Sequence, residues 1–259
     1  MKSLYKKINI HPFLYILLLL SFLCGLFKDV ICLFIVLFIH ELGHIIMSFL
    51  FKWDIKEIKL NITGGELIYN EKIDKNFTEE FIIALSGIFI QLIFQMILQS
   101  LFNNFYINYK TFFMFTKYNI SNILFKLIPI VPLDGSKLLN IFLNIFYPYK
   151  KSLIITNYLS IVFFIFFIFF IKLDTSNLFL IFMFINCIYD SFKNVNYLFN
   201  RFLYERYKYP LKSQKKETIK GKKLSKMKRQ KTHLFKINNE YIKEEKILSK
   251  IFDLNIKIW

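Results

Sequence analysis

The chain has 259 residues, of which 55% are hydrophobic and 33 are phenylalanine, and its mean hydropathy is +0.42. It carries 35 Lys and Arg against 18 Asp and Glu, a net charge of +17. The length alone would allow one or two soluble domains, but the way the apolar residues gather into long runs excludes them. We therefore expect an all-α polytopic membrane protein.

Apolar runs long enough to cross a bilayer recur along the chain. A helix needs about 20 apolar residues to cross a ~30 Å hydrocarbon core, and residues 152–171 supply such a run without a charge. The first run is expected to be an uncleaved anchor, because no cleavage site of small residues follows it. We predict about six transmembrane helices, at roughly 8–27, 30–51, 79–102, 111–133, 152–171 and 174–190.

The basic residues are concentrated at the C-terminal end. Residues 201–259 hold 18 Lys and Arg against 6 Asp and Glu, which is +12 of the net +17. Lys- and Arg-rich segments beside membrane spans stay in the cytoplasm, so we predict that both termini are cytoplasmic. The anionic bilayer surface already explains this charge, and no nucleic-acid partner is expected. We divide the chain into a six-span domain, 1–195, and a basic cytoplasmic tail, 196–259.

The loop after the second predicted span has a weak strand pattern. Residues 55–62 alternate in polarity in places, and residues 66–69 are again mostly apolar. Gly64 and Gly65 lie between the two pieces, so we predict a short β-hairpin that turns at this Gly-Gly pair. Its backbone groups could not face lipid unpaired, and we therefore expect the hairpin to be membrane-associated, against the helices or at the interface.

The second predicted span holds the sequence HELGH, from His40 to His44, within an otherwise apolar run. A carboxylate at the centre of a membrane helix costs roughly 2.5–3.5 kcal/mol on insertion scales. Histidines four residues apart project from one helix face and can reach one zinc ion. Glu41 is then placed to take a proton from the attacking water. A bound dication would offset the cost of burying these polar groups.

A catalytic zinc needs a third protein ligand and an open fourth position. Asp134 is the only acidic residue near the inner end of the fourth predicted span. The remaining candidates look like interfacial or solvated residues: Glu79, Glu80, Asp190, His11 and His233.

Four segments together resemble the site-2 protease family of intramembrane zinc metalloproteases, and within it a bacterial sporulation branch. They are FIHELGH at 38–44, Gly64-Gly65, ALSG at 84–87 and PIVPLDG at 129–135. The resemblance covers residues 10 to about 195. It implies one Zn²⁺ per chain with Asp134 as the third ligand.

The same resemblance implies hydrolysis of membrane-tethered or membrane-associated protein substrates near the cytoplasmic face of the bilayer. For the sporulation branch it further implies a sigma-factor precursor as substrate, inhibitory membrane partners, and a location in the cell or forespore membrane.

The sequence departs from the family pattern at several positions. The family usually has Asn where Lys126 stands and Gly where Ser136 stands, and Gln91 occupies a frequent Asn position. Since the family Asn is thought to help hold the substrate, Lys126 and Asn122, one helical turn earlier, are the candidates to replace it. The branch often carries a nucleotide-sensing CBS domain. This tail is too short and polar for a full one, and we expect a shortened or partly disordered replacement.

An extended substrate exposes backbone groups that the edge of a strand could pair with. We therefore expect the Gly64-Gly65 hairpin to bind the substrate beside the metal.

Two other classes of function are compatible with the apolar spans. A catalytically silent protein that binds transmembrane helices would be favoured if any of His40, Glu41, His44 or Asp134 were missing. A metal transporter would need acidic or histidine residues on more than two spans, and the sequence holds one such cluster. An HExxH protease with a later glutamate ligand is disfavoured, because no suitable acidic pair follows within a span.

Overall fold

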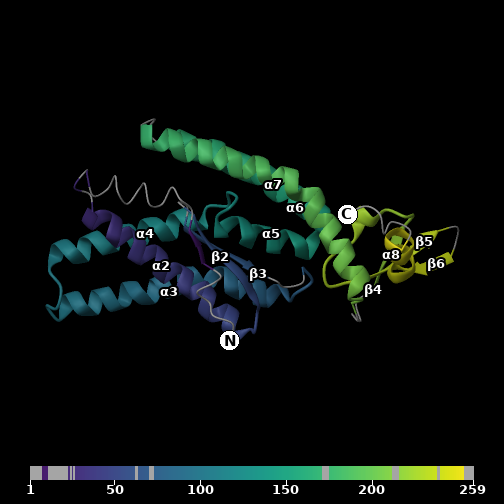
Figure 1. Cartoon of the computed structure of the whole chain (residues 1–259), viewed down its shortest axis with the longest axis horizontal. Coiled ribbons are helices and arrows are strands. Elements are labelled where there is room, and N and C mark those ends of the chain that lie inside the picture. The colour runs from purple at the N-terminus through teal and green to yellow at the C-terminus, as the bar shows by residue number, and fades with distance from the viewer. Residues whose placement is uncertain are drawn as a thin grey trace. The chain divides into compact units, whose positions relative to one another are not determined.

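The computed structural model describes residues 8–10, 23, 25, 27–61, 64–69, 73–170, 175–211, 216–237 and 240–253. The chain divides into two compact units, Met1–Glu71 with Thr78–Leu127, and Lys72–Phe77 with Ile128–Trp259. The first unit contains β1 (Ile8–Ile10), α2 (Phe27–Leu50), β2 (Ile55–Asn61), β3 (Gly64–Tyr69), α3 (Phe77–Asn103) and α4 (Tyr109–Leu127) (Figure 1). The second contains α5 (Asp134–Phe146), α6 (Tyr149–Phe170), α7 (Thr175–Lys208), β4 (Lys216–Lys220), a 3₁₀ turn (Leu224–Lys226), β5 (Thr232–Ile237), β6 (Glu240–Lys243) and α8 (Glu244–Phe252).

Three of the described helices are long and apolar enough to cross a membrane, namely Phe27–Leu50, Phe77–Asn103 and Tyr149–Phe169. They coincide with three of the six predicted spans. The first predicted span falls mostly on residues outside the described part of the chain. α4 and α7 are helical where spans were predicted, but α4 carries three lysines and α7 continues past 190 into charged residues. The number six therefore stays a prediction.

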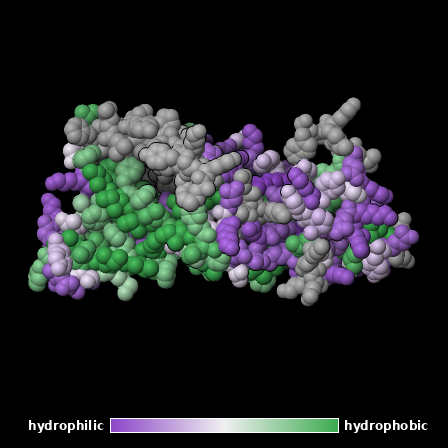
Figure 2. All heavy atoms as spheres, turned by 60° about the horizontal axis from the view of Figure 1, so that its bottom comes forward, coloured by the Kyte–Doolittle hydropathy of each residue, from purple (hydrophilic) through white to green (hydrophobic). Residues whose placement is uncertain are grey.

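The outer faces of α2 and α3 are apolar. Phe38 is 63% exposed, Phe89 67% and Met96 72%, and Figure 2 shows hydrophobic side chains gathered over one region of the surface. Large apolar side chains exposed along long helices are typical of contact with lipid tails rather than water. This molecule is an integral membrane protein.

The loop after α2 forms a three-stranded sheet with the order β1-β2-β3. β2 pairs antiparallel with β3, with Leu60 opposite Gly65 and Asn61 opposite Gly64, which confirms the predicted hairpin. The predicted turn is wrong, because both glycines lie inside β3 and the connection falls at 62–63, outside the described residues. β1 pairs parallel with β2, so residues 8–10 are extended where the first span was predicted to begin. The tyrosine that ends β3, Tyr69, is anchored to α2 by its hydroxyl, 2.9 Å from Ser48 Oγ.

In the second unit, polar contacts hold the loop before α5 onto α6. The hydroxyl of Ser160 donates to the Pro129 carbonyl oxygen and accepts from the Val131 amide, both at 3.3 Å. α5 begins at Asp134, directly after this loop. These contacts fix the loop that leads into Asp134, the first residue of α5.

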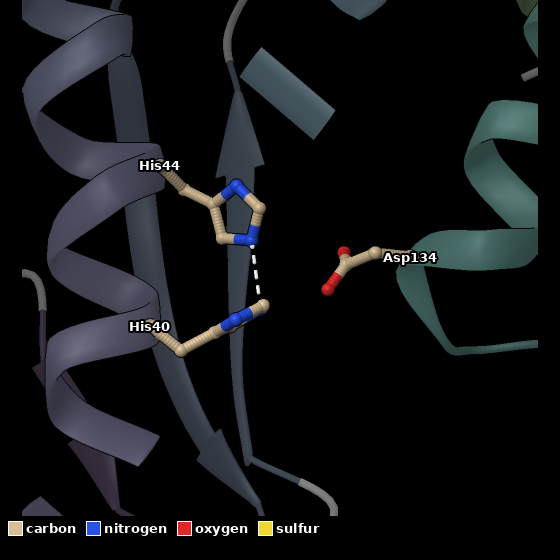
Figure 3. A group of neighbouring side chains, drawn as sticks. All are labelled: His40, His44 and Asp134. Atoms are coloured by element: carbon tan, nitrogen blue, oxygen red, sulfur yellow. Dashed lines mark hydrogen bonds between the residues drawn. The ribbon is translucent and has the colours of Figure 1, made fainter. Parts of the chain in front are cut away.

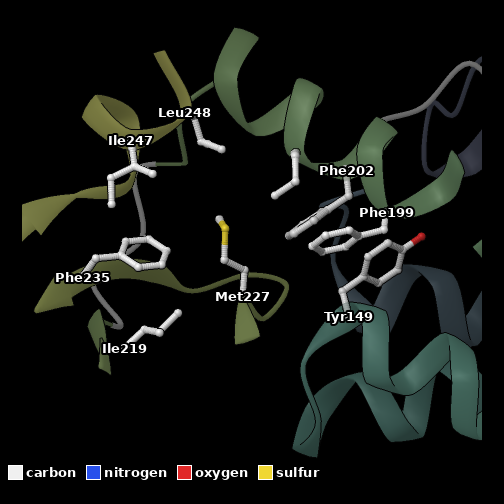
Figure 4. Close-up of a cluster of buried hydrophobic side chains, with 9 residues drawn as sticks. Tyr149, Phe199, Phe202, Ile219, Met227, Phe235, Ile247 and Leu248 are labelled. Carbon is white, nitrogen blue, oxygen red and sulfur yellow. The ribbon is translucent and has the colours of Figure 1, made fainter. Parts of the chain in front are cut away.

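The described residues of the C-terminal segment are folded, as the shortened replacement of the two expected alternatives requires. β4 pairs parallel with β5, and β5 pairs antiparallel with β6. A buried cluster joins these strands to α6, α7 and α8 (Figure 4): Tyr149, Phe199, Phe202, Leu203, Ile219, Met227, Phe235, Ile247 and Leu248. The predicted boundary between 195 and 196 lies inside α7, and the division into 1–195 and 196–259 stays a prediction.

Buried charges reinforce this segment. The Arg206 guanidinium pairs with Asp74 and with Glu244, whose carboxylate also lies 3.0 Å from Nδ1 of His233. His233 is 1% exposed, so the expectation that it is solvated was wrong. The many lysines of this segment gave no indication of β5, a strand in which the alternate side chains of His233 and Phe235 are buried.

Candidate metal centre

α2 places His40 and His44 on one buried face, as their spacing predicts. The side chains are 0% and 6% exposed, and their Nε2 atoms lie 3.1 Å apart. Both residues belong to a continuous helix from Phe27 to Leu50, so the backbone fixes their relative position.

The other nitrogen of each ring is held by α3. Nδ1 of His44 lies 2.7 Å from the Ile83 carbonyl oxygen, and Nδ1 of His40 lies 3.0 Å from Oε1 of Gln91. Both partners are acceptors, so each Nδ1 donates its hydrogen and each neutral ring directs a lone pair from Nε2.

The two Nε2 atoms lie 3.1 Å apart, a contact that is a hydrogen bond when one of them carries a proton and that a bound cation would replace. A tetrahedral zinc with Zn–N distances of about 2.0–2.1 Å separates two ligand nitrogens by about 3.3 Å. The observed separation of the Nε2 atoms therefore fits a zinc ion.

A glycine makes room for the two rings. A Cβ atom at Gly87 would lie 2.6 Å from Cε1 of His40 and 2.7 Å from Nε2 of His44. Contacts under 3.0 Å are essentially never seen for real Cβ atoms, so a side chain at this position would displace the imidazoles. The last residue of the ALSG segment is thus required by the histidine pair.

Asp134, in the second unit, offers a buried carboxylate. It is the first residue of α5, is 2% exposed, and has Oδ1 2.9 Å from Nζ of Lys137. His40, His44 and Asp134 are buried and each offers one ligand atom (Figure 3). Two imidazoles and one carboxylate form a donor set typical of catalytic zinc, so this buried group could bind a metal.

Glu41 is buried beside this face, at 5% exposure, and a second ionisable side chain accompanies it. Nζ of Lys126, on α4, lies 3.5 Å from Oε1 of Glu41. Asn122 is half-buried one turn earlier, and its amide nitrogen has no hydrogen-bond partner among the described residues. Gly64 and Gly65 lie on β3, at an edge of the described sheet.

Sequence reasoning underrated Gln91 and Gly87. Gln91 is 0% exposed in an otherwise apolar stretch of α3. A buried amide in such a helix signals a polar partner nearby, but the partner, His40, is known only once α2 and α3 are packed.

We expect Gln91→Leu to weaken zinc binding by about 10- to 100-fold, as is usual when the partner of a metal-binding histidine is removed. The leucine cannot accept the hydrogen from His40 Nδ1, so the ring loses its orientation. Zinc affinity measured by competition with a chromogenic chelator checks this, with Gln99→Leu, on the exposed part of α3, as control. Equal affinities for the two variants would contradict the role of Gln91.

Known proteins resemble this chain in sequence and fold. No model of a known protein family matches it. The chain is 33% identical over 209 residues to Stage IV sporulation protein FB of Bacillus subtilis (strain 168), covering 79% of this chain and 73% of that protein. It is also similar to the solved structure of the site-2 protease from Methanocaldococcus jannaschii. The TM-score is 0.55, the identity is 25%, and the match covers 75% of this chain and 93% of that one.

Proposed function

The chain belongs to the site-2 protease family of intramembrane metalloproteases, and from this membership we propose that it is an active zinc metalloendopeptidase. It would hydrolyse peptide bonds of membrane-tethered or membrane-associated proteins near the cytoplasmic face of the bilayer. The observation that carries the proposal is the histidine pair, whose Nε2 atoms are 3.1 Å apart while both Nδ1 atoms are held by acceptors.

The proposed ligands of one zinc ion per chain are His40, His44 and Asp134. Zinc at this position would supply Lewis-acid activation of the attacking water and of the scissile carbonyl. The Ile83 carbonyl and the Gln91 side chain orient the two histidine rings, and all three proposed ligands are buried.

Glu41 is the proposed general base. Its carboxylate would accept a proton from the attacking water and return it to the leaving amine. It follows His40 directly on α2, so the helix carries the base and two ligands as one rigid piece.

The proposed substrate contact is the edge of β3. A transmembrane helix hides its peptide carbonyls in backbone hydrogen bonds, so the substrate must be extended locally before cleavage. β2 lies between β1 and β3 in the described sheet, so the strand with Gly64 and Gly65 has an edge available for an extended segment. Asn122 is a second candidate, since its buried amide nitrogen could donate to a substrate carbonyl.

The finer proposal concerns biological context. The similarity to Stage IV sporulation protein FB supports a membrane-associated sigma-factor precursor as substrate in a spore-forming cell, with inhibitory membrane partners. A cleavage assay that compares such a precursor with an unrelated membrane-tethered protein tests this assignment. Equal cleavage of both would reject it.

The proposed activity is tested with the full chain purified in detergent. We expect one zinc per chain by elemental analysis, cleavage of a membrane-tethered precursor, loss of cleavage after chelation, and recovery when zinc is restored. An Asp134→Ala variant should lose zinc. Full zinc occupancy in that variant would show that the third ligand is another residue, and cleavage by zinc-free protein would overturn the proposal.

A further inference from the structure

Lys126 is the least expected side chain near the candidate metal centre. It lies in the last turn of α4, is 4% exposed, and has Nζ 3.5 Å from Oε1 of Glu41, itself 5% exposed. A buried ammonium or carboxylate is costly unless an opposite charge accompanies it. Each of these two side chains therefore accounts for the burial of the other.

The helix that carries Lys126 is fixed against its neighbours at two further points. The Tyr118 hydroxyl donates to Asp29 on α2 at 2.9 Å. The Asn119 amide donates to the Gln91 carbonyl oxygen on α3 at 3.1 Å. α4 is thus held against α2 and α3 near its middle, and the same helix carries Lys126 in its last turn.

We propose that Lys126 is a positioning residue for Glu41, an inference that rests on the proposed function. The ion pair fixes the carboxylate of the proposed base, Glu41, beside the two histidines. The neutral Asn that the family usually has at position 126 could not form such a pair. A carboxylate on a flexible two-carbon stem has several rotamers, and a misplacement of about 1 Å can cost about 10²-fold in rate. The ammonium restricts that freedom.

The first test measures the pair without any cleavage assay. Thermal unfolding in detergent with a chelator present is compared for wild type, Lys126→Met, Glu41→Gln and the double variant. Each single change removes one charge of the buried pair and should lower the unfolding temperature by roughly 6–20 °C, whereas the double variant should recover most of the loss. Lys110→Met, an exposed lysine on the same helix, is the control and should change little. Additive losses in the double variant would overturn the ion pair.

The second test separates positioning of the base from contact with substrate. Lys126→Met should lower kcat by about 10- to 100-fold with little change in KM, and should keep its zinc. Lys126→Arg, which retains the positive charge, should lower kcat less. A raised KM with unchanged kcat would assign Lys126 to the substrate and overturn the proposal. If the wild type cleaves nothing, the proposed function fails, while the unfolding cycle still decides whether Lys126 and Glu41 are paired.

Discussion

The Glu41→Gln variant should bind one zinc per chain, remain folded at the assay temperature, and lose cleavage by about 10²–10⁴-fold. The amide has nearly the shape of the carboxylate, so the helix and both histidines keep their positions. It cannot accept a proton from water, so the first step of hydrolysis lacks its base. The rate of product formation and the zinc content are measured on the same preparation.

The control for this experiment is the same chemical change at an exposed site, Glu245→Gln in α8. It should keep full activity. Retention of more than a small fraction of wild-type cleavage in Glu41→Gln, with zinc bound, would exclude Glu41 as the base. Loss of zinc together with activity would instead indicate that Glu41 supports the metal centre directly.

The histidine face could be predicted because it depends only on local geometry. His40 and His44 are four residues apart in a run that is helical by composition, and the helix period sets their common face. A partner for the buried Glu41 could also be predicted, because ionisable groups at membrane depth are almost always paired. Local spacing therefore predicts which side chains face one another on a single element.

The hairpin shows where local rules fail. Glycine pairs are frequent in tight turns because glycine adopts positive φ readily, so Gly64-Gly65 was read as the turn. In the structure both lie on β3, opposite Leu60 and Asn61. The register is set by the pairing of whole strands, including β1, which the hydropathy pattern assigned to a membrane span.

Contacts between distant elements were beyond prediction from one sequence. Lys126 and Glu41 are 85 positions apart, and His40 and Gln91 are 51 apart. Lys126 was recognised as a departure from the family pattern, but its partner depends on how α4 packs beside α2. His233 and Glu244 are only 11 positions apart, but their contact depends on the pairing of β5 with β6, which the lysine-rich sequence did not indicate.

Zinc binding should be abolished by Gly87→Ala as completely as by His44→Ala, although position 87 provides no ligand. The new methyl group would lie 2.6–2.8 Å from atoms of both imidazoles. The rings cannot simply turn away, because Gln91 and the Ile83 carbonyl hold their Nδ1 atoms. The methyl group must therefore break these hydrogen bonds or separate the Nε2 atoms. Zinc content after gel filtration measures the outcome.

Gly43→Ala is the matched variant on the facing helix, and it should fail differently. Its methyl group would overlap the backbone oxygen of Ser86, and backbone cannot move aside as a side chain can. We expect Gly43→Ala to separate α2 from α3 and to lower the unfolding temperature of the metal-free protein more than Gly87→Ala does. Wild-type zinc content in Gly87→Ala would show that the imidazoles can shift to accommodate the methyl group. Steric exclusion of a side chain would then no longer explain the glycine at position 87.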